Sequence, residues 1–266
     1  VDDKLLIDGW GKDKSADQAL DFHFEAGRTY KIRIEFVNDR RGARVIFGYS
    51  AGRENFPAAV EAARKADVAI LCMGDNEETS GENFDRTDLN LPGRQLELVQ
   101  AVYATGTPVV LVLQSGRPVT ANWENDHLPA ILEAWFPGEQ GGTAIAKTLF
   151  GDAAPGGRLP ITFPRSVGQI PCHYSRRPGG GKRYVEMDWL PLYPFGYGLT
   201  YTTFAYRDMA LSRSVIDPQD TVTVSVTVTN TGKYTGDAVP QLYVRDMFSS
   251  VVKPERQLAA FRRLTL

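Results

Sequence analysis

Hydrophobic and polar positions divide the sequence into three stretches with different patterns. In the first stretch, apolar and polar residues alternate over residues 3–8, 19–24, 30–36 and 44–49. An alternation of period two places apolar side chains on one face of a strand, so we expect an antiparallel β unit with one solvated face. Its first strand starts within the opening residues, and we therefore expect this unit to be cut short at its N-terminus.

The pattern changes near residue 55, where helical and strand-like segments begin to alternate. Three short runs are apolar throughout, as in strands covered on both faces: residues 67–73, 108–113 and 130–135. Helical spacing or composition marks the segments around them: residues 58–66, the stretch that begins at Pro92, and residues 143–150. Strands that alternate with helices predict parallel βαβ units and hence an α/β sandwich.

From about residue 203 the pattern is again that of strands alone. Residues 221–229 alternate strictly and end at the turn residues Asn230-Thr231-Gly232. Residues 238–244 predict another strand, and Pro240 within it indicates an edge or a bulge because proline has no N–H to donate. The pattern is typical of a small β-sandwich of fibronectin type III character. It ends after too few strands to close, so we expect this unit to be truncated as well.

Composition narrows the function classes. The 266 residues are 42% apolar and 23% charged, an ordinary globular balance, and the net charge of -2 argues against a nucleic-acid partner. No apolar run is long enough to cross a bilayer, and the opening residues do not form a signal or transit peptide. Cys72 lies in an apolar run and is expected to be a buried free thiol, without a disulfide to Cys172. The cysteines and the scattered histidines lack metal-ligand spacing, so we expect no metal and no cofactor.

The most polar loop follows the first buried run. Residues 74–88 hold six carboxylates and a single arginine, and in parallel sheets ligands gather where strands end. Crowded carboxylates raise one another's pKa, which is what a general acid needs near neutral pH. Taken alone, the stretch is more often a solvated acidic loop.

Other motifs are weaker. Residues 179–182 resemble a phosphate loop but lack its upstream glycine, and Ser115 lacks the glycine of a nucleophile elbow at position 113. We interpret Ser115 as a turn residue. Residues 135–138, Trp-Phe-Pro-Gly, follow a buried run and are interpreted as packing rather than as a sugar platform.

Several segments match a known family in order. Ser80–Arg86, with Leu91–Gln95, resembles the acid/base loop of glycoside hydrolase family 3. Further signatures of that family follow at residues 135–142, 149–152, 156–164 and 194–204. The C-terminal stretch resembles the fibronectin type III-like domain of many members. The N-terminal stretch resembles the tail of a protective antigen-like domain, which some β-glucosidases carry as an insertion.

The resemblance implies a multidomain protein of α/β plus all-β class. Residues 1–54 would be the C-terminal part of the protective antigen-like β domain, residues 55–202 a three-layer α/β sandwich with a parallel sheet, and residues 203–266 a truncated fibronectin type III-like domain. Family members also have an N-terminal (β/α)8 barrel that supplies a nucleophilic aspartate. Nothing in this sequence matches that barrel, so we expect a fragment, or one chain of a divided enzyme, that is inactive alone.

The resemblance further implies a retaining, exo-acting β-glucosidase that removes terminal non-reducing β-D-glucosyl residues by double displacement. Glu82 is identified as the general acid/base, with Glu78 and Glu77 as runners-up. Phe84 would shield the site and contact substrate, and Asp85 with Arg86 would tie the loop to its own domain as an ion pair. Asn83 replaces a common glycine of the family pattern.

The expected partners are a β-glucoside or cello-oligosaccharide, as in cellulose degradation, and the missing barrel portion. The resemblance favours a periplasmic or secreted protein over a cytoplasmic one and leaves a homodimer open. A β-xylosidase or N-acetylglucosaminidase of the same family stays an alternative. So do a non-catalytic carbohydrate-binding or scaffolding module and, outside the family, a serine hydrolase centred on Ser115.

Overall fold

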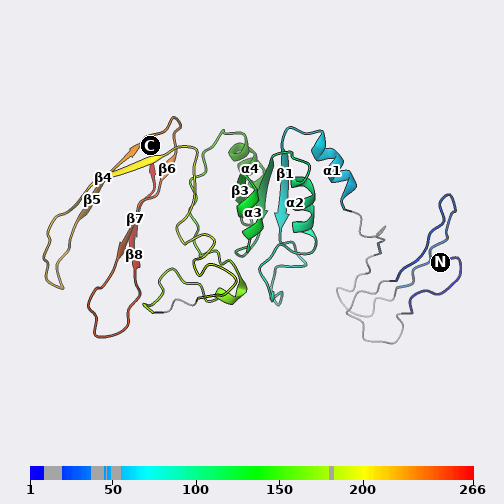
Figure 1. Cartoon of the computed structure of the whole chain (residues 1–266), viewed down its shortest axis with the longest axis horizontal. Coiled ribbons are helices and arrows are strands. Elements are labelled where there is room, and N and C mark those ends of the chain that lie inside the picture. Colours follow the sequence, from blue (N-terminus) through cyan, green and yellow to red (C-terminus); the bar gives the residue numbers. More distant parts are fainter. Residues whose placement is uncertain (9–19, 37–44, 46, 49–54, 180–182) are drawn as a thin grey trace. The chain divides into compact units, whose positions relative to one another are not determined.

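A computed structural model describes residues 1–8, 20–36, 45, 47–48, 55–179 and 183–266 (Figure 1). By its internal contacts the chain divides into two compact units, Val1–Arg53 and Glu54–Leu266.

A parallel sheet forms the centre of the α/β part of the second unit. Strands β1 (Ala69–Gly74), β2 (Val109–Gln114) and β3 (Ala130–Glu133) lie in the order β1-β2-β3, and both pairings are parallel. Four helices alternate with these strands: α1 (Pro57–Arg64), α2 (Gln95–Tyr103), α3 (Asn122–His127) and α4 (Gly141–Leu149). The expected α/β arrangement with a parallel sheet is therefore confirmed. Helix α3 was not expected, because its sequence Asn-Trp-Glu-Asn-Asp-His has no apolar periodicity.

The largest hydrophobic cluster of this part packs on one face of the sheet, and Val112 is buried on the other. Val109, Leu111 and Leu113 of β2 are almost fully buried and belong to one cluster with residues of α1 and α2. Val99 and Val102 supply the α2 side of that cluster, as their helical spacing predicted. The burial of β2 follows from its central position, where it has a strand on either side.

Strand β1 differs from the expectation of cover on both faces. Ile70 and Cys72 are exposed, and their register places them beside Val110 and Val112 on the face opposite the core cluster. The expectation that Cys72 is buried is thus wrong for the described structure. The apolar run around Cys72 belongs to a strand that packs on one face. Strand β1 lies at the edge of the sheet, where the second face need not be covered.

Two signature segments pair beyond the helices. Leu159 donates its N–H to Tyr197 O at 2.8 Å, and Gly196 donates to Leu159 O at 2.8 Å. Phe163 forms an isolated antiparallel bridge with Tyr193 and is itself buried. A short 3-10 turn, η1 (Val167–Gln169), follows this bridge. The segments 156–164 and 194–204, distant in sequence, therefore lie together and lead into the C-terminal strands.

The C-terminal residues form short antiparallel ladders. Strand β4 (Phe204–Leu211) pairs with β5 (Val224–Asn230), β6 (Asp237–Ala238) with β9 (Leu264–Thr265), and β7 (Gln241–Val244) with β8 (Gln257–Phe261). The expected strand within residues 221–229 is confirmed as β5. The expected interruption at Pro240 is confirmed as well, because β6 ends at Ala238 and β7 begins at Gln241.

The first unit departs from its expected strands. Residues 1–8 and 20–36 contain no strand, and the remaining part of the expected pattern lies partly outside the described residues. Asp2 donates its backbone N–H to Lys31 O at 2.9 Å and accepts from Lys31 N–H through its side chain at 2.8 Å. Alternation provides an apolar face, but a strand also needs continuous backbone pairing, and these bonds join the two segments at one point.

Candidate active-site loop

The acidic loop begins where β1 ends, at the carboxyl edge of the parallel sheet (Figure 1). Gly74 has φ of 139°, and a Cβ at this position would overlap the carbonyl group of Gln114 on β2. The Gln95 side chain accepts from Gly74 N–H at 2.7 Å and donates to Gly74 O at 2.8 Å. The first residue of the loop is thereby bonded to the first residue of α2.

Three charged side chains meet at the base of this loop. The Asp75 carboxylate is 3% exposed, lies 3.3 Å from Arg117 Nε and 3.5 Å from Arg86 Nη1, and accepts from Thr79 Oγ1 at 3.0 Å. Arg117 comes from the loop after β2 and also donates to Thr79 O at 3.1 Å. Because the site is buried, these ion pairs are screened by solvent less than surface pairs are.

Arg86 continues this network along the outgoing part of the loop. Its Nη2 donates to Asp88 Oδ1 at 3.0 Å and to Asn90 O at 3.0 Å. The expected ion pair between Asp85 and Arg86 is not formed, because the guanidinium is directed to Asp75 and Asp88 while Asp85 is exposed. Arg86 does hold the loop to its own domain, but its partners are Asp75 and Asp88 instead of Asp85.

The segment from Ser80 to Asp85 lies between these contacts and forms the tip of the loop. Glu82 is exposed within it, and Phe84 is 46% exposed. Phe84 donates its N–H to Gly81 O at 3.2 Å, closing a turn in which Asn83 has φ of 64°. Glycine and asparagine tolerate this left-handed conformation best, so Asn83 suits the place where the family pattern commonly has glycine.

The two runner-up carboxylates lie in an earlier turn of the loop. Glu77 and Glu78 are exposed between Asn76 and Thr79, and Thr79 donates its N–H to Asn76 O at 3.2 Å. Glu78 donates its backbone N–H to Asn76 Oδ1 at 3.0 Å. The structure thus brings all three candidate carboxylates onto one loop, with Glu82 alone of the three in the tip.

An aromatic side chain approaches the tip from the end of β3. An ideal Cβ on Gly116 would lie 2.7 Å from Phe136 Cε2 and 3.3 Å from Ser80 Oγ, so the glycine allows both to lie close. Phe136 is 55% exposed, whereas Trp135 contacts Phe163 edge to face with ring centroids 5.7 Å apart. The expected packing role therefore fits Trp135, and Phe136 remains half-open to solvent beside the loop.

Glu133, at the carboxyl end of β3, was not expected from the sequence. Its Oε1 accepts from Trp135 N–H at 2.9 Å, while Oε2 is buried without a hydrogen-bond partner among the described residues. Burial raises the pKa of Glu133 to about 7. A single carboxylate inside the apolar run 130–135 was the available signal, and the run was interpreted only as a strand.

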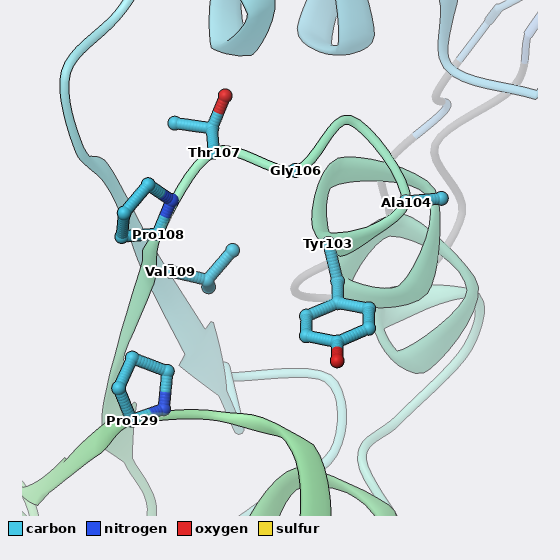
Figure 2. Close-up of a pocket in the computed structure, with 7 residues that line it drawn as sticks. All are labelled: Tyr103, Ala104, Gly106, Thr107, Pro108, Val109 and Pro129. Carbon is cyan, nitrogen blue, oxygen red and sulfur yellow. The ribbon is translucent and has the colours of Figure 1, made fainter.

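A shallow pocket lies at the opposite end of β2. Figure 2 shows its lining, in which Tyr103 faces Val109 across the gap and Pro108 and Pro129 form one side. Val109 begins β2, whereas Gln114 ends it beside the acidic loop. The described residues that line it include no carboxylate.

Within the described residues, no helix is long and apolar enough to cross a membrane. Within the same residues, no group of three or more His, Cys, Asp or Glu side chains could hold a metal ion.

The second unit thus combines a parallel α/β domain, an acidic loop at the carboxyl edge of its sheet, and antiparallel β ladders that follow it in the chain. Residues 8–201 match the glycosyl hydrolase family 3 C-terminal domain, and residues 238–266 match the fibronectin type III-like domain. The chain belongs to glycosyl hydrolase family 3. The family resemblance of the sequence is thereby confirmed.

Known relatives are glycosidases of greater length. The chain is 48% identical over 248 residues to a beta-xylosidase of Formosa agariphila, covering 89% of this chain and 34% of that protein. It is 46% identical over 219 residues to the periplasmic beta-glucosidase of Salmonella typhimurium, covering 78% of this chain and 29% of that protein. The chain thus spans well under half the length of these relatives.

Solved structures give the same picture. A β-glucosidase from Erythrobacter marinus is 44% identical with a TM-score of 0.76, covering 78% of this chain and 29% of that one. The β-glucosidase from Listeria innocua in complex with glucose is 31% identical with a TM-score of 0.75, covering 78% of this chain and 30% of that one.

Proposed function

We propose that this chain is the acid/base-bearing portion of a retaining, exo-acting β-glucosidase that hydrolyses terminal non-reducing β-D-glucosyl residues of β-glucosides and cello-oligosaccharides. The observation that carries the proposal is the exposed Glu82 in the tip of a loop whose base is fixed at the carboxyl edge of the sheet. A carboxylate that serves a substrate held by another domain has to project from its own domain, and Glu82 does.

The mechanism needs a second carboxylate that this chain does not supply. A (β/α)8 barrel of the same enzyme would provide a nucleophilic aspartate that attacks the anomeric carbon. Glu82 would protonate the departing glycosidic oxygen and then take a proton from the water that hydrolyses the covalent intermediate. Retention requires the two carboxyl groups to lie about 5 Å apart, so the loop tip would reach over the mouth of the barrel. Phe84, half-exposed two residues away, would shield that site and contact the sugar.

The domain boundaries belong to this proposal too. We assign residues 1–54 to a protective antigen-like β domain, 55–202 to a three-layer α/β sandwich and 203–266 to a truncated fibronectin type III-like domain. The family match ends at residue 201, near the proposed boundary at 202, whereas it begins at residue 8 and so crosses the boundary proposed at 54. The separate first unit, Val1–Arg53, is consistent with a domain boundary near residue 54.

β-Xylose is the second candidate sugar, and the 48% identical beta-xylosidase is the observation that favours it. Xylosides lack the hydroxymethyl group of glucosides, so the choice depends on the pocket for that group. We propose glucose because the beta-glucosidases among the relatives include both solved structures described above. The Salmonella relative is named periplasmic, which supports a compartment outside the cytoplasm for this protein.

The assignment of Glu82 is tested in the enzyme that joins this chain to its barrel. Glu82→Ala is expected to lower kcat/KM for cellobiose by about 10²- to 10⁴-fold, the usual contribution of a general acid. The loss should be much smaller for an activated aryl β-glucoside, whose leaving group needs no protonation. Michaelis–Menten kinetics on both substrates measure the difference.

Glu77→Ala and Glu78→Ala are the matched controls, since both carboxylates are exposed on the same loop. They should leave the ratio of the two kcat/KM values unchanged. An equal loss on both substrates in Glu82→Ala, or the selective loss in a control variant, rejects Glu82. Two results together would favour a non-catalytic module. The chain would bind glycans equally well with and without Glu82→Ala, and the Glu82→Ala enzyme would stay active.

A further inference from the structure

We propose that Asp75 and Arg117 are positioning residues for the acid/base, acting with Arg86 as a clamp that holds the base of the loop. This inference rests on the proposed role of Glu82 and adds two residues that the loop sequence itself does not single out. Neither residue is expected to touch the sugar.

The clamp joins both limbs of the loop to the strand edge. On the incoming limb, Asp75 and Thr79 contact Arg117, which stands at the end of the neighbouring strand. On the outgoing limb, Arg86 contacts Asp75 and also binds Asp88 and Asn90 O. Asp75 is therefore the point at which the two arginines, from different parts of the chain, meet.

Burial makes this arrangement unusually restrictive for a loop. The side chains of Asp75, Arg86 and Arg117 are 3%, 16% and 23% exposed, so solvent cannot readily replace their mutual contacts. Each guanidinium donates to at least one backbone carbonyl besides the carboxylate, and its planar geometry fixes the directions of those bonds. The limbs at Thr79 and Asn90 are thereby held by directional bonds, and the tip from Ser80 to Asp85 is left to carry Glu82.

A second anchor on the outgoing limb supports the same conclusion. Asn90 accepts from Thr120 Oγ1 at 2.6 Å, and Thr120 donates its backbone N–H to Leu89 O at 2.9 Å. Thr120 belongs to the same loop after β2 as Arg117. The loop after β2 therefore contacts both limbs of the acidic loop. A substitution at Arg117 should shift the position of Glu82 without altering any group that contacts substrate.

The first experiment measures catalysis in the enzyme joined to its barrel. Arg117→Met is expected to reduce kcat/KM for cellobiose by about 10- to 100-fold, as a displacement of about 1 Å of a catalytic group does, with a smaller loss on an activated aryl glucoside. In a Glu82→Ala background, Arg117→Met should cause little further loss, because the residue acts through Glu82. Additive losses, or equal losses on both substrates, would overturn the positioning role.

Conservative and control variants separate positioning from folding. Arg117→Lys keeps a positive charge beside Asp75 and should recover thermal stability, but a point charge cannot reproduce the two-directional donation, so the selective loss on cellobiose should persist. Arg263→Met breaks a more exposed ion pair away from the loop, Arg263 to Asp237 at 2.7 Å, in the β ladders. It should leave the ratio of the two kcat/KM values unchanged, and a selective loss there would contradict the proposal.

The second experiment needs no catalysis and uses the 266-residue chain. Backbone ¹⁵N relaxation should give order parameters near 0.85 at Thr79 and Arg86, falling toward 0.6 in Arg117→Met but not in Arg263→Met. Unchanged order parameters would overturn the clamp. The order parameters could fall in Arg117→Met as expected while Glu82→Ala shows no selective loss on cellobiose. In that case the clamp holds the loop but the proposed function fails.

Discussion

At the scale of single residues, Glu133 is a titratable group whose pKa the fold shifts strongly. Its pKa is raised by burial from an ordinary 4.5 to about 7, so the folded protein binds its proton more tightly than the unfolded chain does. Between pH 4.5 and 7 the folded state therefore holds more protons, and the contribution of Glu133 to stability falls as pH rises through this range. Above pH 7 the ionised carboxylate destabilises the fold by as much as about 3 kcal/mol.

Glu133→Gln should remove this dependence. The amide can still accept from Trp135 N–H but carries no charge, so the variant should be more stable than the parent at pH 8 and similar to it at pH 4.5. Urea denaturation of the chain at the two pH values measures the change. Glu61→Gln, which breaks an exposed ion pair with Lys65 on α1, is the control and should change stability at pH 8 by no more than about 0.5 kcal/mol. A variant that is no more stable than the parent at pH 8 would contradict the effect assigned to Glu133.

At the scale of elements, the two faces of the sheet make different contributions to stability. Leu111 on β2 is fully buried against the α1 and α2 cluster, whereas Ile70 on β1 is 45% exposed on the opposite face. Leu111→Ala should lower the free energy of unfolding by about 2 to 5 kcal/mol, because it removes buried methyl groups and leaves a cavity. Ile70→Ala should cost less than about 1 kcal/mol.

Chemical denaturation of both variants tests this contrast. Similar losses would mean that the open face of β1 is covered in the folded chain. Labelling of Cys72, which lies on that face, offers an independent check, since an exposed thiol should react readily with a soluble maleimide in the native protein.

Elements set by local periodicity were predictable from the sequence, and features set by distant partners were not. Strand β5 and the break at Pro240 followed from alternation and from the missing N–H of proline. Arg86 was expected to bind its neighbour Asp85, but its buried partner Asp75 is eleven residues away, and Arg117 comes from another strand end. The prediction that Cys72 is buried was wrong for the same reason. Whether a sheet face is covered depends on which other segments pack on it, and the periodicity of the strand does not identify them.

The candidate site was predictable in composition rather than in geometry. The family pattern pointed to Glu82, and its role stays a prediction; the structure adds that this carboxylate is exposed in the tip. Glu133 was missed because one charge in an apolar run does not reveal whether the side chain is buried. The expected strands at residues 3–8 and 30–36 were also wrong, since alternation alone does not provide the pairing that a strand needs.

At the scale of the whole molecule, the chain belongs to a family whose members described above are about three times as long. In the proposed function it supplies the acid/base but not the nucleophile. The purified 266-residue chain should therefore show no turnover of aryl β-glucosides. Mixing it with the barrel-bearing portion should restore hydrolysis, and the same mixture made with Glu82→Ala should remain slow on cellobiose. Release of nitrophenol by the chain alone would contradict the division of the active site between two parts.

The bond between Gly74 and Gln95 has a consequence for how such a loop can evolve. Gly74, which opens the loop, forms two hydrogen bonds with Gln95, the first residue of α2. The two ends of the loop are therefore held at a fixed separation. Insertions or substitutions between Gly74 and Gln95 would change how far the loop extends without disturbing the sheet. The position of Glu82 can therefore change through substitutions in the loop alone, while β1 and α2 stay in place.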